Sequence, residues 1–267
     1  MNNFPKITII TPSFNQAKFL EKTILSVLNQ NYPNLEYIVV DGGSTDGSLE
    51  IIKKYDHQLT WWVSEKDNGQ ASAINKALRR STGTWVGWQN SDDIYYNGVF
   101  HELASIANKN PKVGLIIPDM MLIDEQDNII RDVRYVKPTY NSVLAEGMVL
   151  SNQSAFWRSE LHNDIGFLNE KYQYSFDLDW FLRLLKKTTS IHIDNIWGGF
   201  RQHDDTKSNT NKKIFIKENE MIIGKYAKSF WQKKFFQFRR LFLMLLNGQL
   251  RYILRGLINF LIHSNKR

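Results

Sequence analysis

The sequence predicts an α/β fold in which a mixed sheet is flanked by helices and followed by an amphipathic helical tail. Over residues 6–97, short β-branched runs alternate with helical segments, which is typical of parallel strands joined by right-handed crossovers. After residue 97 the alternation becomes irregular, which favours strands of both directions. From Lys228 to Arg267 there are nine Lys and Arg residues and no Asp or Glu, so the tail differs in kind from the rest of the chain.

The first half of the chain predicts four strands with helices between them. Strands are expected at 6–11, 36–41, 60–64 and 84–89, and helices at 17–30, 45–55 and 70–80. Pro12 is expected to end the first strand. Ser44 or Thr45 is expected to cap the second helix, because a short polar side chain accepts a hydrogen bond from the first helical turn.

Polar residues follow each of these four strands. They are Thr11 to Asn15, Asp41, Glu65 to Asp67, and the pair Asp92 and Asp93. A ligand of a sheet of this kind binds beyond the carboxyl ends of the strands. The placement of all four polar segments at one edge therefore indicates a binding site there.

The second half predicts a more varied set of elements. Helices are expected at 97–109 and 176–187, and extended segments at 113–119, 120–124, 129–136, 152–158 and 190–194. Residues 120–124 and 129–136 flank the polar segment 125–128, which indicates a hairpin.

The composition excludes several classes of protein. The chain has 267 residues, of which 42% are hydrophobic and 23% charged, as in a globular protein rather than a disordered or fibrous one. The absence of cysteine excludes disulfides, zinc–cysteine sites and thiol catalysis. The N-terminus lacks the apolar stretch of a signal peptide, and no run of about 18 apolar residues indicates a membrane span. These features favour a reducing, cytoplasmic location.

The pair Asp92 and Asp93 is the strongest single chemical signal. Adjacent carboxylates repel each other, so a cation or a hydrogen-bond donor usually stabilises them. A hard divalent ion with oxygen ligands suits them, and Mg²⁺ or Mn²⁺ bridging a diphosphate fits best. From the pair alone, a solvated acidic turn with Asp93 capping the next helix is the favoured interpretation, and the other motifs decide between the two.

A series of short motifs places this pair in context. The motifs are Thr11 to Asn15, Ser26 to Gln30, Val40 to Gly47, Ser64 to Gln70, Asn90 to Asp93, Asn152 to Arg158, Asp177 to Trp180, and Arg201 to His203. Together they resemble the family 2 glycosyltransferases of the GT-A fold, over about residues 6–208. The resemblance implies a nucleotide-binding mixed sheet and an inverting transfer of sugar from a nucleoside diphosphate donor.

The same resemblance assigns roles to individual residues. It implies nucleoside binding by Thr11, Pro12, Asn15, Asp41 and Asp67. It also implies that Asp92 binds ribose or metal, that Asp93 binds the metal, and that His203 is a third metal ligand. Two positions depart from the pattern: Gly42 stands where some relatives have an aspartate that contacts the base, and Asn90 where many have an aspartate. Arg201 and Lys207 are candidates for neutralising phosphate, or are ordinary solvated charges.

Asp177 is the candidate catalytic base. On the expected helix it shares a stripe with Trp180, Phe181 and Leu184, so it should lie at the lip of a buried face. A charge stabilised by the helix dipole is the alternative from spacing alone, and the resemblance favours the base. Asp179 lies on another face, four residues before Arg183, and is expected to form a surface ion pair.

The expected function follows from these assignments. A UDP-sugar is the favoured donor, and the acceptor is a hydroxyl of a glycan or lipid-linked molecule, in cell-envelope polysaccharide or lipopolysaccharide synthesis. Asn152, Gln153 and Trp157 are expected to line the acceptor site, whereas Trp61 and Trp85 are expected in the core. A nucleotidyltransferase is the alternative enzyme, although no glycine-lysine loop for a triphosphate is present. A non-catalytic glycan- or lipid-binding module is the other alternative.

The tail is expected to be a separate unit of residues 226–267, after a catalytic domain of residues 1–225. The first 227 residues hold 25 basic and 27 acidic groups, so the net charge of +7 comes from the tail. A basic stripe beside an aromatic and apolar one is typical of a helix in a membrane interface. We therefore expect peripheral attachment to the inner face of the cell membrane through anionic lipid. Packing on the catalytic body or on a second subunit is the alternative, and the apolar surface is excessive for nucleic acid.

Overall fold

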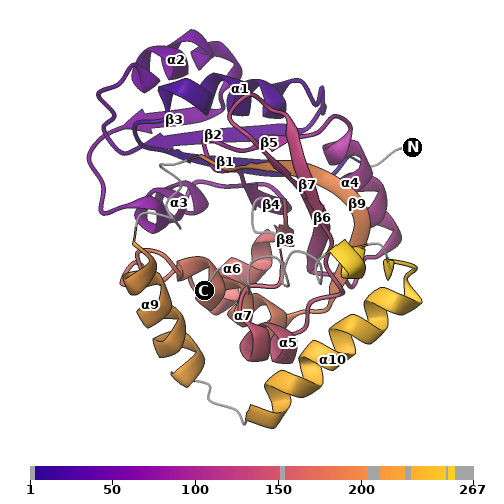
Figure 1. Cartoon of the computed structure of the whole chain (residues 1–267). Helices are drawn as coiled ribbons and strands as arrows, with labels where there is room; N and C mark the ends of the chain where they lie inside the picture. The colour runs from indigo at the N-terminus through magenta and orange to yellow at the C-terminus, as the bar shows by residue number, and fades with distance from the viewer. Residues whose placement is uncertain (1–3, 151–153, 204–210, 226–229, 251, 256–267) are drawn as a thin grey trace.

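The protein is built around one mixed sheet with helices on both faces (Figure 1). The computed structural model describes residues 4–150, 154–203, 211–225, 230–250 and 252–255. In the described residues the strands run in the order β3-β2-β1-β4-β8-β6-β9-β5, and β7 pairs with β6. The first four strands are parallel: β1 (Ile7–Ser13), β2 (Leu35–Asp41), β3 (Trp61–Ser64) and β4 (Trp85–Trp88). The predicted parallel half of the sheet is thus confirmed.

Three helices connect these strands and cover opposite faces of the sheet. They are α1 (Ala17–Leu28), α2 (Ser48–Lys54) and α3 (Gln70–Leu78). Successive side chains of a strand point to opposite faces, so Ile9 packs in the cluster that contains α1, whereas Ile10 packs in the cluster that contains α3. Burial on both faces explains why the strands of this half are almost continuously apolar.

Two local expectations for this half are wrong. Pro12 does not end β1, which continues to Ser13, because the last β1–β4 pair is Ile10 with Trp88 and no ladder bond to β4 is lost at Pro12. Neither Ser44 nor Thr45 caps α2. Its N-cap is Gly47, in the left-handed conformation with φ +100°, because the two polar residues belong to the loop that follows β2.

The second half of the sheet contains strands of both directions, as the irregular pattern predicts. These strands are β5 (Ile94–Tyr95), β6 (Leu115–Ile123), β7 (Ile129–Val133), β8 (Phe156–Arg158) and β9 (Ser190–Arg201). β8 is antiparallel to β4 and β6, whereas β9 is parallel to β6. β9 continues seven residues beyond the expected 190–194, and this extension brings Arg201 beside the residues that follow β4.

Of the remaining helical elements, one precedes β3 and the others accompany the second half of the sheet. They are the short turn η1 (Asp56–Gln58) and the helices α4 (Val99–Lys109), α5 (Tyr140–Glu146), α6 (Ser159–Ile165), α7 (Phe176–Lys187), α9 (Lys212–Lys225) and α10 (Phe230–Leu246). The sequence analysis did not predict α5, α6 or α9. Within the described residues, no helix has both the length and the apolar content that a membrane crossing requires.

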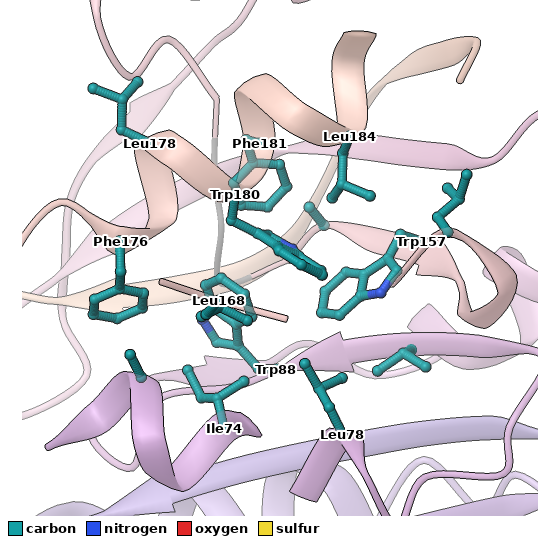
Figure 2. Packing of buried hydrophobic residues seen from close by; sticks show 14 of the residues in the cluster. Ile74, Leu78, Trp88, Trp157, Leu168, Phe176, Leu178, Trp180, Phe181 and Leu184 are labelled. Carbon is teal, nitrogen blue, oxygen red and sulfur yellow. The ribbon is translucent and has the colours of Figure 1, made fainter. Parts of the chain in front are cut away.

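The largest buried cluster lies between α7, α3 and β4 (Figure 2). Trp180 and Phe181 of α7 are fully buried there, with Trp88 from β4 and Trp157 from β8. The ring of Trp157 lies edge-on to those of Trp88 and Trp180, with centroids 5.7 and 5.6 Å away. Trp85 is buried in the other cluster, as expected, and Trp61 is only half-buried at the rim.

Candidate functional site

The carboxyl ends of β1, β2, β3 and β4 meet at one edge of the sheet, where the predicted site residues gather. Asp41, the last residue of β2, is fully buried. Its carboxylate accepts hydrogen bonds from the backbone N–H of Gly43 (3.1 Å) and Ser44 (2.9 Å) and from Ser64 Oγ (2.7 Å). The Ser44 hydroxyl also donates to the Asp41 carboxylate. Asp41 therefore fixes the conformation of the loop after β2 from its buried side.

The end of β1 supplies the opposite wall of this edge. Thr11 and Pro12 are buried, and the Thr11 hydroxyl lies 3.0 Å from that of Tyr37. Asn15 is exposed, with φ +51°, and its side-chain oxygen accepts from Thr45 N at 2.9 Å. Asn15 thus ties the loop after β1 to the loop after β2 and holds the rim of the edge in place.

The backbone of Gly42 lies between the side chains of Phe14, from the loop after β1, and Asp67, from the loop after β3, and we call this place the cradle. A Cβ atom placed on Gly42 would lie 3.2 Å from Asp67 Oδ2 and 3.2 Å from the ring of Phe14. Phe14 is 60% exposed, although its side chain is large and apolar. Asp67 is half-buried, and its other oxygen accepts from Gly69 N at 2.8 Å. A side chain at position 42 would therefore crowd both groups, whereas glycine lets the backbone lie between the aromatic ring and the carboxylate.

The sequence analysis overlooked Phe14 as a site residue. The available signal was an aromatic residue inside the otherwise polar motif Thr11 to Asn15, at the end of a buried strand.

Asp92 and His203 come together at the acidic site. Asp92 Oδ2 lies 3.0 Å from His203 Nε2, although 111 residues separate them in the chain. The side chain of Asp92 is 16% exposed to solvent, and that of His203 is 3% exposed. The ring of Phe19 packs beside that of His203, with centroids 4.9 Å apart. The expected convergence of these two residues is therefore present.

Asp93 points into the protein rather than out of it. It is fully buried, and its oxygens accept from Arg201 N (2.8 Å) and from Asn90 Nδ2 (3.0 Å). Burial and then the neighbouring Asp92 carboxylate raise the pKa of Asp93 well above its ordinary value, against those two hydrogen bonds. A cation near this pair would favour its ionised form.

Asn90 explains how this sequence accommodates a buried carboxylate. Its amide nitrogen donates to Asp93, and its oxygen accepts from Gln70 Nε2 at 2.8 Å. An aspartate at position 90 would place a third carboxylate beside Asp92 and Asp93 and could not donate this bond.

Arg201 fixes the loop that carries Asp92 and Asp93. Arg201 is fully buried, and its Nε donates to the carbonyl oxygen of Asp92 at 2.7 Å. Its Nη1 donates to the carbonyl oxygen of Asp124 (2.9 Å) and pairs with Asp127 (2.6 Å) in the turn between β6 and β7. Arg201 is therefore a buried structural cation and not a solvated one, and its role toward phosphate stays a prediction. Lys207 lies outside the described residues.

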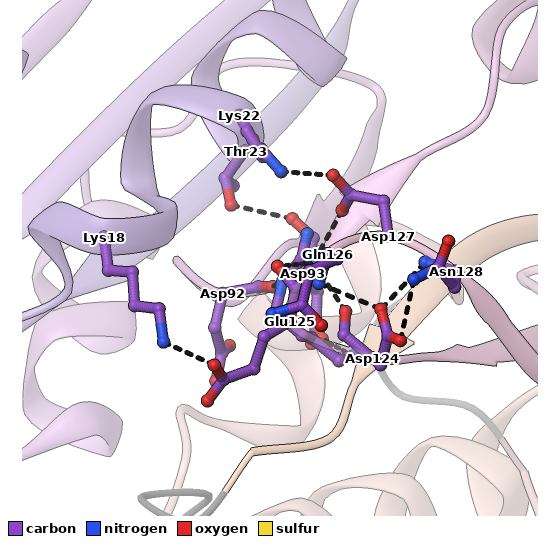
Figure 3. A network of polar contacts seen from close by, with 11 residues as sticks. Lys18, Lys22, Thr23, Asp92, Asp93, Asp124, Glu125, Gln126, Asp127 and Asn128 are labelled. Atoms are coloured by element: carbon purple, nitrogen blue, oxygen red, sulfur yellow. Dashed lines mark hydrogen bonds and ion pairs between the residues drawn. The ribbon is translucent and has the colours of Figure 1, made fainter.

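The β6–β7 turn is also tied to α1, as Figure 3 shows. Lys18 pairs with Glu125 at 2.5 Å, and Lys22 pairs with Asp127. Thr23 donates to the carbonyl oxygen of Asp93 at 2.7 Å. Helix α1 and the hairpin therefore hold the acidic loop between them.

Asp177 lies in the first turn of α7, which begins beside the end of β4. It is half-buried. The preceding residue, Phe176, contacts Trp88, with ring centroids 6.3 Å apart (Figure 2). Trp88 is the last residue of β4 and precedes Asp92 by four positions. The start of α7 thus faces the end of the sheet that carries the acidic loop. The assignment of Asp177 as the base stays a prediction.

Glu218, which was not predicted as a functional residue, fixes the segment that leads into α7. The carboxylate of Glu218, on α9, accepts from the backbone N–H of Gln173 (2.8 Å), Tyr174 (2.8 Å) and Ser175 (2.9 Å). No local motif predicts this contact, because Glu218 lies more than 40 residues further along the chain.

Asp179 and Arg183 do form the expected ion pair, at 2.9 Å, but the pair is not on the surface. Asp179 is buried. The Arg183 guanidinium also donates to the carbonyl oxygens of Ile165 and Phe167, at 2.9 Å each. The pair therefore fastens α7 to the segment that follows α6.

Trp157 does not line an acceptor site. It is fully buried in the cluster beneath α7, and its Nε1 donates to His162 Nδ1 at 3.3 Å. Burial lowers the pKa of His162, which favours the neutral acceptor form. Asn152 and Gln153, the other two residues expected there, lie outside the described residues.

A second acidic group lies elsewhere on the sheet. Asp119, His192 and Asp194 each offer a metal-ligand atom, and these atoms lie within 4.8 Å of one another. However, buried Asp119 accepts from Arg134 Nη1 (3.0 Å), Tyr135 N (2.8 Å) and His192 Nε2 (2.9 Å). Arg134 already supplies positive charge there, so a metal ion would have to displace it.

Comparison with known sequences supports a relationship over most of the chain. The family model "Glycosyl transferase family 2" matches residues 8–150. The chondroitin synthase of Escherichia coli is 26% identical over 226 residues, which cover 84% of this chain and 32% of that protein. The chain likewise spans about a third of the length of several other curated relatives.

Solved structures share the fold. TarS of S. aureus in complex with UDP-GlcNAc matches with a TM-score of 0.69 and 19% identity, over 85% of this chain and 69% of that one. The mannosyltransferase PcManGT of Pyrobaculum calidifontis, in complex with GDP-Man and Mn²⁺, matches with a TM-score of 0.58 and 19% identity, over 85% and 66%. The mixed sheet described above is therefore that of the GT-A glycosyltransferases.

Proposed function

The chain belongs to glycosyltransferase family 2, and we propose that it transfers one sugar from a nucleoside diphosphate-sugar to an acceptor hydroxyl, with inversion. The observation that carries this proposal is the arrangement at the sheet edge. Gly42, Phe14 and Asp67 and the pair Asp92 and His203 lie near the carboxyl ends of the parallel strands, and α7, with Asp177 in its first turn, begins beside Trp88 at the end of β4.

The nucleoside is proposed to bind in the cradle between the loops after β1 and β2. The exposed ring of Phe14 offers a flat apolar face for a base. The Asp67 carboxylate beside it can accept hydrogen bonds from the base or the ribose. A UDP-sugar is the favoured donor.

The donor set suits a divalent ion, and Mn²⁺ better than Mg²⁺. Asp92 Oδ2 and His203 Nε2 would hold the ion, since a carboxylate oxygen and an imidazole nitrogen together suit a transition metal. When bound, the ion supplies electrostatic stabilisation of the diphosphate leaving group. Asp93, Asn90 and Arg201 keep the Asp92 loop in position, so the ligands are oriented before the donor arrives.

Asp177 is proposed to accept the proton of the attacking hydroxyl. Asp177 lies in the first turn of α7, a position at which acidic residues are common, and the backbone contacts of Glu218 fix the segment that leads into this helix. A base held beside the acceptor is expected to contribute about 10²–10⁴-fold to the rate.

The acceptor is proposed to be a hydroxyl of a glycan or of a lipid-linked glycan, in cell-envelope polysaccharide synthesis. The chondroitin synthase of E. coli, named above, supports a polysaccharide setting.

Binding measurements with Mn²⁺ and UDP test the metal and the donor together. Isothermal titration of the protein with UDP, with and without Mn²⁺, is expected to show metal-dependent binding that Asp92→Asn weakens by about 100-fold. Asp194→Asn is the matched control, because it removes a 73%-exposed carboxylate of the other acidic group and should leave binding unchanged. The opposite pattern would move the metal to Asp119 and His192 and overturn this assignment.

Analysis of the reaction products distinguishes a glycosyltransferase from a nucleotidyltransferase. Release of UDP from a UDP-sugar supports glycosyl transfer, whereas release of pyrophosphate from a nucleoside triphosphate would establish the nucleotidyltransferase instead.

A further inference from the structure

Helix α10 is turned with its apolar stripe away from the protein. Phe235, Phe238, Phe242 and Leu245 recur at helical spacing, and each is 50–70% exposed. Leu241 extends the stripe and is 46% exposed. Single exposed apolar residues are ordinary on a protein surface, but a continuous stripe of large ones marks an interaction surface. We call these five residues the outer stripe.

The opposite side of α10 holds the helix in this orientation. Met244 is buried, and Arg240 pairs with the buried Glu146 of α5 at 3.2 Å. Beyond α10, Arg255 pairs with Asp132 of β7 at 2.5 Å. Because the helix is fastened to the body along this side, it cannot rotate to bury the outer stripe without breaking these contacts.

A cavity of about 330 Å³ lies between α10 and residues 133–149. Val136, Met148 and Met244 line it, and so does Leu241 of the outer stripe. Arg239 and Lys137 also line it. Neither residue forms a salt bridge within the part of the chain that the structure describes, so both charges are available to an anion beside the outer stripe.

The charge distribution decides which partner fits this surface. Residues 228–267 carry nine Lys and Arg and no Asp or Glu. Two copies of such a surface would repel each other across an interface, whereas an anionic bilayer would attract it. A phosphate-tracking surface for nucleic acid would not need five large apolar side chains in one stripe.

We infer that the outer stripe of α10 docks in the interface of a bilayer rich in anionic phospholipid, with Arg239 and Lys137 binding lipid phosphate at the cavity beside it. The apolar rings lie at the boundary of headgroups and acyl chains, as in other interfacial helices. This inference does not depend on the proposed sugar transfer.

Flotation with lipid vesicles tests the docking surface. The full-length protein is expected to float with phosphatidylcholine vesicles that contain about 30% phosphatidylglycerol and not with pure phosphatidylcholine, because both the apolar and the charged contributions are needed. The double variant Phe238→Ser, Phe242→Ser should reduce the partition coefficient on the order of a hundredfold. Ile216→Ser, at a 55%-exposed position on α9 outside the outer stripe, is the matched control and should bind as the parent protein does.

A second variant tests the phosphate contacts. The change Lys137→Gln with Arg239→Gln is expected to reduce partitioning about thirtyfold, since each basic group near an anionic surface contributes about fivefold. Equal binding to neutral and anionic vesicles would overturn the charge argument. Absence of binding, with a concentration-dependent dimer that the double Phe variant abolishes, would assign the surface to a second copy. Turnover of a UDP-sugar with a soluble acceptor should be the same in all variants, so failure of docking is distinct from failure of catalysis.

Discussion

Helices α7 and α10 are both amphipathic, but the apolar stripe of α7 faces the protein interior and that of α10 faces solvent. In α7, Trp180, Phe181 and Leu184 point into the protein and are fully buried. In α10, Phe235, Phe238 and Phe242 point outward and are more than half exposed. The difference lies in what each helix meets on the side that faces the body: α7 lies over the aromatic side chains of β4 and β8, whereas α10 meets a carboxylate of α5 and the edge of a cavity.

The comparison teaches that amphipathicity defines a stripe but not its partner. A helix buries its apolar stripe where another apolar surface is available. Where ion pairs hold its polar side instead, the stripe is left for a partner outside the chain. α7 therefore contributes to stability and to the site, whereas α10 contributes an exposed surface.

The largest expected effect follows from truncating a buried ring of α7. Phe181→Ala removes a fully buried side chain that packs on Trp88. It should lower the free energy of unfolding by about 3–5 kcal/mol, from lost transfer energy and the cavity left behind. Chemical denaturation measures this change. A loss below about 1 kcal/mol would show that the α7 cluster is not the principal core.

The next prediction separates the two aspartates of α7. Asp177→Asn should lower kcat about a thousandfold and leave the melting temperature unchanged, because it removes a base. Asp179→Asn should lower the melting temperature and leave kcat of the folded protein unchanged, because it breaks the buried pair with Arg183. Activity and thermal unfolding, measured on both variants, would contradict the assignment if Asp179 proved the catalytically important one.

The buried Glu36 of β2 and the partly exposed Arg255 of the tail should contribute differently to stability as the pH falls. Burial tends to raise the pKa of Glu36, but hydrogen bonds from Lys6, Thr8 and Thr82 outweigh it and lower the pKa from 4.5 to about 2. Because the pKa of Glu36 is lower in the folded state than in the unfolded state, its ionised carboxylate stabilises the folded protein above pH 4.5. This contribution to the free energy of unfolding is lost as the pH falls towards 2.

Unfolding measured from pH 7 to pH 2 tests this difference. Glu36→Gln should cost on the order of 3 kcal/mol at pH 7 and much less at pH 2. Arg255→Gln removes a partly exposed ion pair between the tail and Asp132 of β7 and should cost less than about 1 kcal/mol. A Glu36 variant with the same deficit at both pH values would contradict the assignment.

The smallest expected effect is the counterpart of the first. Phe238→Ala removes a ring of the same size from α10, where it is 70% exposed. Its effect on unfolding without lipid should stay within about 0.5 kcal/mol. A loss comparable with that of Phe181→Ala would show that α10 packs its apolar stripe against protein, and the contrast between the two helices would fail.

Much of the fold was predictable because its signals are local. The alternation of strands and helices over residues 6–97 predicted the parallel half of the sheet, and the turn at 125–128 predicted the β6–β7 hairpin. Strand β5 has two residues, and α5 and α6 have seven each. Elements of this length carry too little periodicity to be recognised, and contacts distant in sequence stabilise them.

The site was predictable in its location and less so in its side-chain directions. Asp41, Asp67 and Asp92 were expected at one edge, because the carboxyl ends of parallel strands share an edge. Trp157 was misassigned, because its motif does not reveal that helix α7 covers it.

The sequence by itself determined where polar residues follow strands and which helical residues share a stripe, since both depend only on the local repeat of the backbone. Tertiary structure alone decided that Asp93 points inward, that Arg201 is buried beneath the acidic loop, and that α10 faces outward. Each of these depends on residues far apart in the chain, such as Asp93 with Arg201 and Arg240 with Glu146. The repeat of a helix or strand specifies its faces, and only packing specifies what each face meets.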